Sequence, residues 1–228
     1  MILRRMVLLA TVLLAQKAMA EGVTVAGSMT TLGPAVQVSA PYNDVVNLRL
    51  FLGGYRYTTD EDLSGINYDA KYTLSGLGAI MDWHPFGSGF HISLGLFRTS
   101  NRFDGRSIDA AEYAIGANTY SASEVQSLRV KADLGAGAPY SGMGWGYAIG
   151  ETGWGFEVEA GVVYQASPVA VVYANPGPAL SGNLTAEQSA RLALLRQDQD
   201  LEARNIKDEF DTFKAFPVIS AGVTYTFK

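Results

Sequence analysis

Near the end of the chain, the ten residues Val218-Ile219-Ser220-Ala221-Gly222-Val223-Thr224-Tyr225-Thr226-Phe227 alternate between apolar and small or polar side chains. In an extended strand one face would carry the apolar residues and the other the polar ones. A strand that crosses a membrane needs about 9–11 residues of this alternation, and aromatic residues mark its ends. The segment therefore predicts a strand with one face toward lipid.

The opposite end of the chain, residues 1–20, has the three parts of a secretory signal peptide. Arg4 and Arg5 form the positive start, residues 6–15 form the apolar core, and Ala18-Met19-Ala20 forms the small-residue cleavage site. The apolar run is shorter than the ~20 residues of a transmembrane helix. We expect cleavage after Ala20 and a single exported barrel domain over residues 21–228.

The composition limits the partners and the chemistry. Three of the 17 Lys and Arg residues lie in residues 1–20, so 14 remain against 22 acidic residues, a net charge of -8. An acidic exported chain does not favour nucleic acid as a partner. The absence of cysteine excludes disulfides and thiolate chemistry. A mean hydropathy of +0.08 fits a barrel in which only alternate strand residues meet lipid.

The same alternation recurs along the chain and predicts an all-β fold. We expect strands near residues 23–31, 35–41, 45–58, 68–83, 89–104, 124–147, 153–174 and 211–227. Short connections alternate with long polar ones, which is typical of outer-membrane barrels with short periplasmic turns and long external loops. Aromatic residues gather beside the short turns, as a membrane girdle would: Tyr42, Trp83, Phe86, Phe90, Trp145 and Trp154. The prediction is an antiparallel transmembrane β-barrel of about eight strands in the bacterial outer membrane.

One segment departs from the strand pattern. Residues 185–205 favour a helix, in which Thr185 and Gln188 would form a capping box. This helix would lie in the last long loop. We expect it to remain a solvated loop helix, to cap the external mouth, or to fold into the mouth as a plug.

The charged residues that alternation places on the inner faces are the candidate site. They balance four against four: Arg49, Lys71, Arg129 and Lys131 against Asp82, Asp133, Glu157 and Glu159. Because buried charges must be paired or hydrated, one interpretation is an ion-pair network that seals the lumen. The other is a narrow path for zwitterionic or cationic solutes, in which the acidic groups attract an ammonium group.

Catalytic and cofactor signals are weak. His91 and Ser93 share a strand face, but a Ser–His pair needs a third, orienting group, so an envelope enzyme is the least favoured alternative. The glycine-rich run 141–146 does not follow a parallel strand and is not a phosphate-binding loop. Acidic residues in the long loops lack calcium-ligand spacing. We expect no enzyme activity, no cofactor and no metal.

The second half of the chain resembles the carbapenem-associated ornithine-uptake outer-membrane proteins. The residues that carry the resemblance lie from Asn118 onward and include irregular turn and girdle positions as well as strand residues. They are Asn118-Thr119-Tyr120, residues 127–132, Ala138-Pro139-Tyr140 with Gly142, Gly144 and Trp145, Trp154-Gly155-Phe156 with Glu159, Gly161 and Tyr164, Ser167-Pro168-Val169, and Phe216-Pro217-Val218. The resemblance implies an eight-stranded barrel and uptake of ornithine and other basic amino acids.

Two functions stay open on the sequence alone. The first is a narrow porin for small polar or basic solutes such as amino acids. The second is a structural or surface-interaction barrel whose lumen is closed by ion pairs. The expected partners are outer-membrane lipid, the barrel assembly machinery and, for the porin, small amino-acid-like solutes.

Overall fold

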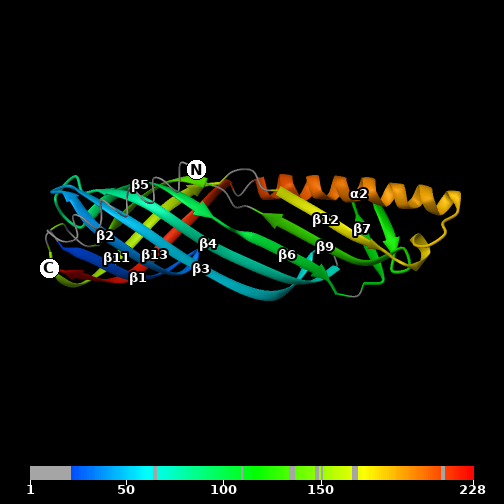
Figure 1. The fold of residues 1–228 in the computed structure, drawn as a ribbon, viewed down its shortest axis with the longest axis horizontal. Coiled ribbons are helices and arrows are strands. Elements are labelled where there is room, and N and C mark those ends of the chain that lie inside the picture. Colours follow the sequence, from blue (N-terminus) through cyan, green and yellow to red (C-terminus); the bar gives the residue numbers. More distant parts are fainter. Residues whose placement is uncertain are drawn as a thin grey trace.

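The protein is elongated, with a barrel at one end and an extension at the other (Figure 1). The computed structural model describes residues 22–63, 66–108, 110–133, 137–146, 149, 151–165, 169–211 and 214–228. The predicted signal peptide lies outside the described residues.

The barrel is a closed ring of antiparallel strands. In spatial order it contains β4 (Ile66–Trp83), β3 (Val46–Leu63), β2 (Gly33–Asn43), β1 (Val23–Thr30), β13 (Ala215–Phe227), β11 (Gly153–Tyr164), β10 (Gly137–Trp145) and β5 (Phe90–Thr99). Pairing of β5 with residues 76–83 of β4 closes the ring. The predicted fold class, an antiparallel β-barrel, is confirmed.

The extension continues one side of the barrel wall. Residues 68–73 of β4 pair with β6 (Arg102–Ser107) instead of β5. β6 pairs in turn with β9 (Val125–Asp133), and β9 pairs with β12 (Val169–Pro176). Asn101 marks the change, because its side-chain oxygen accepts a hydrogen bond from the Ser75 backbone N–H at 3.2 Å. β3 and β4 therefore belong to both parts of the molecule.

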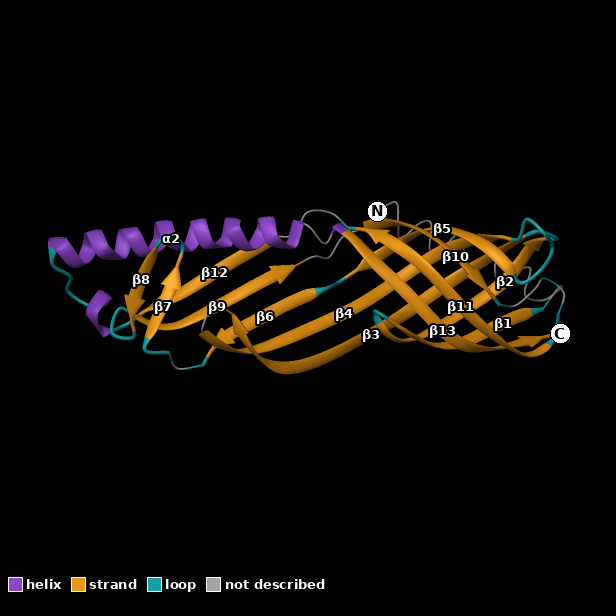
Figure 2. Cartoon of the chain, turned by 180° about the vertical axis from the view of Figure 1, so that it is seen from behind, coloured by secondary structure: helices purple, strands orange, loops and turns teal. Residues whose placement is uncertain are grey.

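A small hairpin and a long helix cover one face of the extension (Figure 2). The hairpin consists of β7 (Glu112–Ile115) and β8 (Asn118–Ser121), and the helix α2 (Ala186–Asp211) follows a 3₁₀ turn η1 (Pro178–Leu180). These elements enclose a cluster that includes Tyr113, Tyr120 and Leu195, all at most 1% exposed.

The predicted helix and its capping box are confirmed. The Thr185 N–H donates to Gln188 Oε1 at 2.9 Å, and the Gln188 N–H donates to Thr185 Oγ1 at 3.3 Å. α2 packs along β12 and lies beside the extension rather than inside the ring (Figure 2). Among the described residues, no helix combines the length and the apolar character needed to span a membrane.

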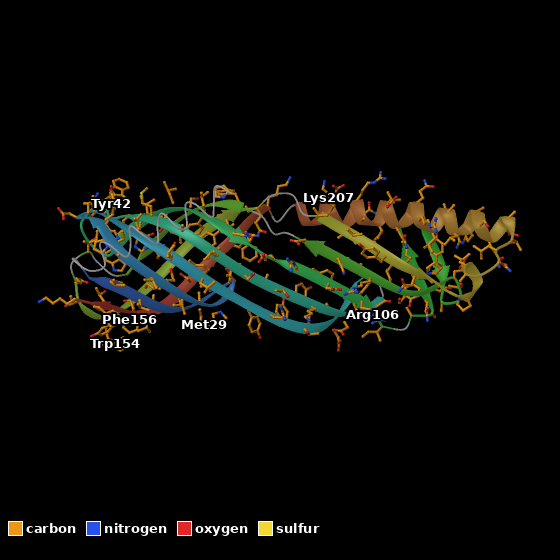
Figure 3. All side chains as sticks on the ribbon, viewed as in Figure 1. Met29, Tyr42, Arg106, Trp154, Phe156 and Lys207 are labelled. Carbon is orange, nitrogen blue, oxygen red and sulfur yellow. The ribbon has the colours of Figure 1, made fainter. Side chains whose placement is uncertain are left out.

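Side chains in the ring alternate as predicted. Outward residues such as Leu94, Met143 and Ile219 are 54–60% exposed, whereas inward neighbours such as Ser93 and Ser220 are buried. We call the end of the ring with the short connections 44–45 and 84–89 the turn end. Most of the predicted girdle is exposed there, with Trp154 81% and Phe86 76% exposed. Figure 3 shows Tyr42, Trp154 and Phe156 gathered toward this end, far from Arg106 and Lys207 on the extension.

Candidate functional site: the lumen of the ring

Arg49 on β3 lies at the centre of a buried polar network inside the ring. Its Nη2 lies 2.8 Å from Asp82 Oδ1 and 3.2 Å from Ser93 Oγ, and its Nη1 lies 2.5 Å from Glu159 Oε2. Ser93 donates to Asp82 Oδ1 at 2.7 Å. Arg49 is 3% exposed and Asp82 is fully buried, so these charges are removed from bulk water.

Gln37 on β2 extends the network toward Glu157. Its side-chain oxygen accepts from Arg49 Nη1 at 2.6 Å, and its side-chain nitrogen donates to Glu157 Oε1 at 2.5 Å and to Ser28 Oγ at 3.0 Å. One amide therefore joins the guanidinium to a carboxylate on the far side of the ring.

Two histidines form a layer between this network and the turn end. His84 Nδ1 lies 2.9 Å from the Ser88 carbonyl and its Nε2 lies 3.2 Å from Asn47 Nδ2. His91 contacts the Gly89 carbonyl through Nδ1 at 3.1 Å and lies 3.7 Å from Glu159 through Nε2. Both rings are at most 1% exposed and their centres are 5.3 Å apart.

Toward the extension, aromatic and aliphatic side chains close the lumen. Phe97 lies between Phe51 and Tyr140, with ring centres 5.1 Å from each, and Leu32 from the β1–β2 turn is fully buried in the same cluster. Tyr140 also donates a hydrogen bond to Glu159, which joins the apolar layer to the charged one. We call the cluster of Leu32, Phe51, Phe97 and Tyr140 the apolar plug.

Glycines on the inner wall make room for these rings. A Cβ atom at Gly78 would lie 2.7 Å from Phe97 Cζ, and one at Gly161 would lie 2.6 Å from Tyr140 Cε2. Both distances are far below van der Waals contact. Inner-wall glycines therefore allow the lumen to be filled by large side chains.

The charges of the described lumen network do not balance. Arg49 faces three buried carboxylates, those of Asp82, Glu157 and Glu159, and His91 is the nearest titratable group that could add positive charge. Uncompensated buried charge is costly. Carboxylates therefore outnumber the guanidinium in the buried network, and the apolar plug packs against its extension side.

Only half of the predicted inward set lies in the lumen. Arg49, Asp82, Glu157 and Glu159 come together there, whereas Lys71, Arg129, Lys131 and Asp133 are exposed on the extension. The lumen prediction for these four is wrong, because the apolar face of β4, β6 and β9 in the extension packs beneath α2 and the charged face is directed to solvent.

Exposed ion pairs replace the predicted lumen contacts in the extension. Arg129 binds Asp104 through Nε at 2.8 Å and Nη2 at 2.7 Å, and Arg102 lies 3.3 Å from Asp133. The Arg129 guanidinium holds the pKa of the Asp104 carboxyl below its usual range. Arg129 on β9 and Glu157 on β11 therefore lie in different parts of the molecule.

Sequence reasoning missed Gln37 and Tyr140 as network members. Alternation shows that a neutral polar residue such as Gln37 faces inward, but it does not show whether that residue hydrogen-bonds to the charged network. For Tyr140 a signal existed, because Gly142 and Gly161 lie beside it on the inner wall and leave space for its ring.

The suggested Ser–His pair takes another form. Ser93 donates to Asp82, and His91 contacts Glu159 and the Gly89 carbonyl. Both side chains are at most 1% exposed, so neither lies in a cleft that a substrate can reach.

Comparison with known proteins connects the chain to one fold. No protein-family model and no curated protein matched the sequence. The crystal structure of Acinetobacter baumannii CarO matched with a TM-score of 0.56 and 19% identity, covering 90% of this chain and 97% of that one. Acinetobacter baumannii CarO2 matched with a TM-score of 0.60 and 22% identity, covering 91% and 99%. The predicted resemblance is therefore confirmed for the fold.

Proposed function

We propose that this protein is an outer-membrane β-barrel with a closed lumen, which holds its extension on the external side of the membrane. The observation that carries the proposal is the closure itself: Arg49, Asp82 and Phe97 are at most 3% exposed. A lumen filled by its own side chains is what a small barrel favours. The ring is then a rigid anchor, and the extension is the part that meets other molecules.

The outer surface of the ring supports the membrane placement. Its strands β5, β11 and β13 have 10, 12 and 13 residues, close to the ~9–11 that span a membrane. Their outward side chains are apolar apart from Arg98 at the extension end of β5, and aromatic residues mark the turn end. The predicted signal peptide and the CarO fold agree with this placement.

Transport of small basic solutes is the competing function. The three carboxylates around Arg49 favour it, because their surplus negative charge would attract an ammonium group. A solute would reach them only after the apolar plug moved aside. Whether the apolar plug stays in place or moves therefore distinguishes a closed barrel from a transport path.

Planar-bilayer recording of the full chain after signal removal tests the proposed function. The parent protein should show no steps of conductance, and liposomes containing it should not swell in ornithine, arginine or glutamate. The triple variant Phe51→Ala/Phe97→Ala/Tyr140→Ala serves as a positive control, because it removes most of the plug. Heat-dependent migration on a gel verifies that each barrel is folded.

Conductance or swelling with the parent protein would overturn the closed-lumen proposal. If Glu157→Gln then reduced uptake of ornithine more than uptake of glutamate, transport would become the function of the acidic lumen. A chain that stayed dissolved without detergent would refute both proposals.

A further inference from the structure

Basic side chains gather where the apolar outer surface of the ring ends. On the outward face of β3, β4 and β5, the last large apolar residues toward the extension are Leu52, Leu77 and Leu96. Just beyond them the same face carries exposed cations. We call these residues the basic belt: Arg56, Lys71, Arg98 and Arg102.

The strand register brings three members of the belt together. Arg56 on β3 and Arg102 on β6 both lie opposite Thr73 of β4, one on each side. Neighbouring strands are about 4.8 Å apart, so the two arginines start about 10 Å from each other. Lys71 lies on the same face of β4, diagonal to both at about 7–8 Å. Three long cationic side chains can thus converge over Thr73.

Nearby carboxylates do not neutralise this group fully. Asp104, opposite Lys71, is held by two hydrogen bonds from Arg129. Asp133 pairs with Arg102 at 3.3 Å, but the Arg102 side chain remains 63% exposed. The cross-strand neighbour of Arg56 is Thr73, an uncharged residue.

The fourth member, Arg98, lies nearest the apolar surface. Its cross-strand neighbours are Leu77 and Gly137, which carry no charge. In a chain with a net charge of -5, the belt is a local concentration of positive charge.

The arginines of the belt lie near the height of a lipid headgroup layer, whereas Lys71, six residues beyond Leu77, lies roughly 15 Å above the end of the apolar surface. Arg98 is two residues beyond Leu96, and Arg56 is four residues beyond Leu52. At about 3.3 Å per residue and a strand tilt of about 40°, these positions lie roughly 5–10 Å above the end of the apolar surface. The polar layer on each side of a bilayer occupies about 5–8 Å. Arginine side chains bridge the remaining distance, since they extend along an apolar surface and place the charge in the polar layer.

We propose that the basic belt binds the phosphate-bearing headgroup of a lipid in the leaflet that faces the extension. Arginine suits this ligand because its planar guanidinium donates two parallel hydrogen bonds to phosphate. Arg56, Lys71 and Arg102 would surround one phosphate group, and Arg98 would contact the lipid closer to its acyl chains. The inference rests on the proposed membrane placement of the ring and adds a specific ligand class to it.

The test measures binding of a soluble anionic lipid to the full processed chain in neutral detergent. The probe is dioctanoyl phosphatidic acid, with dioctanoyl phosphatidylcholine as the lipid that has no net charge. The belt variant is Arg56→Gln/Lys71→Gln/Arg102→Gln. The matched control is Arg196→Gln/Arg204→Gln/Lys207→Gln, which removes the same charge from exposed positions of α2.

The belt variant should bind phosphatidic acid at least tenfold more weakly than the parent, and the α2 variant should bind it as the parent does. Phosphatidylcholine should bind at least tenfold more weakly than phosphatidic acid to the parent. Inorganic phosphate at the same concentration should not compete, because it lacks the acyl chains that hold the headgroup against the ring.

Equal affinity of the belt and α2 variants, or equal affinity for the two lipids, would overturn the proposal. Competition by inorganic phosphate would assign the site to a free anion and would also overturn it. Because these outcomes are measured on barrels that are folded in detergent, they leave the membrane placement standing. A chain that does not fold in detergent would instead refute the placement.

Discussion

The barrel and the extension have opposite polarity, although they share strands. In the barrel half of β4, the inward residue Asp82 is charged and the outward residue Met81 is apolar and 43% exposed. In the extension half of the same strand, the inward residue Tyr68 is buried in an apolar cluster and the outward residue Lys71 is exposed. The reversal occurs near Ser75, with no break in the strand.

This difference fits the proposed placement, in which lipid surrounds the barrel and water surrounds the extension. A strand against lipid presents its apolar residues outward. In a solvated sheet with one face packed against a helix, a strand directs its apolar side chains toward that helix. One strand can satisfy both conditions in succession, provided that its pattern reverses at the boundary.

The largest expected effect comes from breaking the buried network. Arg49→Met leaves the carboxylates of Asp82 and Glu159 without their guanidinium, and loss of one partner of a buried ion pair costs about 3–5 kcal/mol. Urea unfolding in detergent, followed by tryptophan fluorescence, measures this loss.

The exposed pair of the extension provides the control. Arg129→Met removes the contact to Asp104 in solvent and should leave the unfolding midpoint close to that of the parent. If Arg49→Met and Arg129→Met reduced the free energy of unfolding equally, the buried network would be no more important for stability than the exposed ion pair. Adding Asp82→Asn and Glu159→Gln to Arg49→Met should recover part of the stability.

A second prediction compares outward positions on the two sides of the boundary. Leu94→Arg places a charge on the proposed lipid face of β5 and should reduce the free energy of unfolding by about 2–4 kcal/mol. Val169→Arg places the same charge on the outward face of the extension, where Val169 is 65% exposed and lies opposite Asp133, and should change it by less than about 0.5 kcal/mol. Unfolding of both variants in lipid bilayers checks the difference, and similar losses would contradict the reversal of polarity.

A third prediction concerns packing inside the ring. Gly161→Ala forces a methyl group against the Tyr140 ring and should cost about 1–3 kcal/mol. Gly27→Ala is the control, because its Cβ would meet nothing within 4 Å. If urea unfolding gave the same midpoint for both variants, the inner wall would not be tightly filled.

The smallest expected effect is a dependence on pH that is confined to the extension. Arg191, with Nε 2.7 Å from Glu124 Oε1, connects α2 to the segment before β9 and lowers the pKa of the Glu124 carboxyl. A lowered pKa means that the ionised group stabilises the fold. This contribution is complete above the ordinary carboxyl pKa of about 4.3 and is lost as the pH falls through the lowered value.

Hydrogen exchange measures this pH effect locally. Protection of the α2 amides should fall as the pH decreases below about 4.3, while protection in β5 and β11 persists. In Glu124→Gln, α2 should already be less protected at pH 6 and should change less on acidification. A parallel loss of protection in α2 and in the ring would contradict the separation of the two parts.

The sequence was sufficient for the fold class and for half of the candidate site. Alternation identifies which side chains share a face, and it placed Arg49, Asp82, Glu157 and Glu159 correctly in the interior. The same rule failed in the extension, because an alternating sequence looks the same whether its apolar face is directed outward or inward. Only the position of α2, which covers the apolar face of the extension, decides that Arg129 is directed to solvent.

The helix was predictable for a local reason, and its location was not. The capping box of Thr185 and Gln188 lies within one turn of sequence, so its signal does not depend on the rest of the fold. The docking of α2 depends on contacts distant in sequence, such as the hydrogen bond from Tyr120 to Asp198 at 2.6 Å. The periodicity of the sequence does not indicate which residues distant in the chain will be in contact.

The pairing of β1 with β13 has a consequence for biogenesis. These strands come from opposite ends of the described chain, with Val23 opposite Phe227, and their pairing is one of the contacts that complete the cylinder. The cylinder can be completed only after the final strand has been delivered, by which time every residue of the extension has already left the ribosome. The seam between β1 and β13 therefore joins residues about 200 positions apart, and contacts of such high sequence separation form slowly.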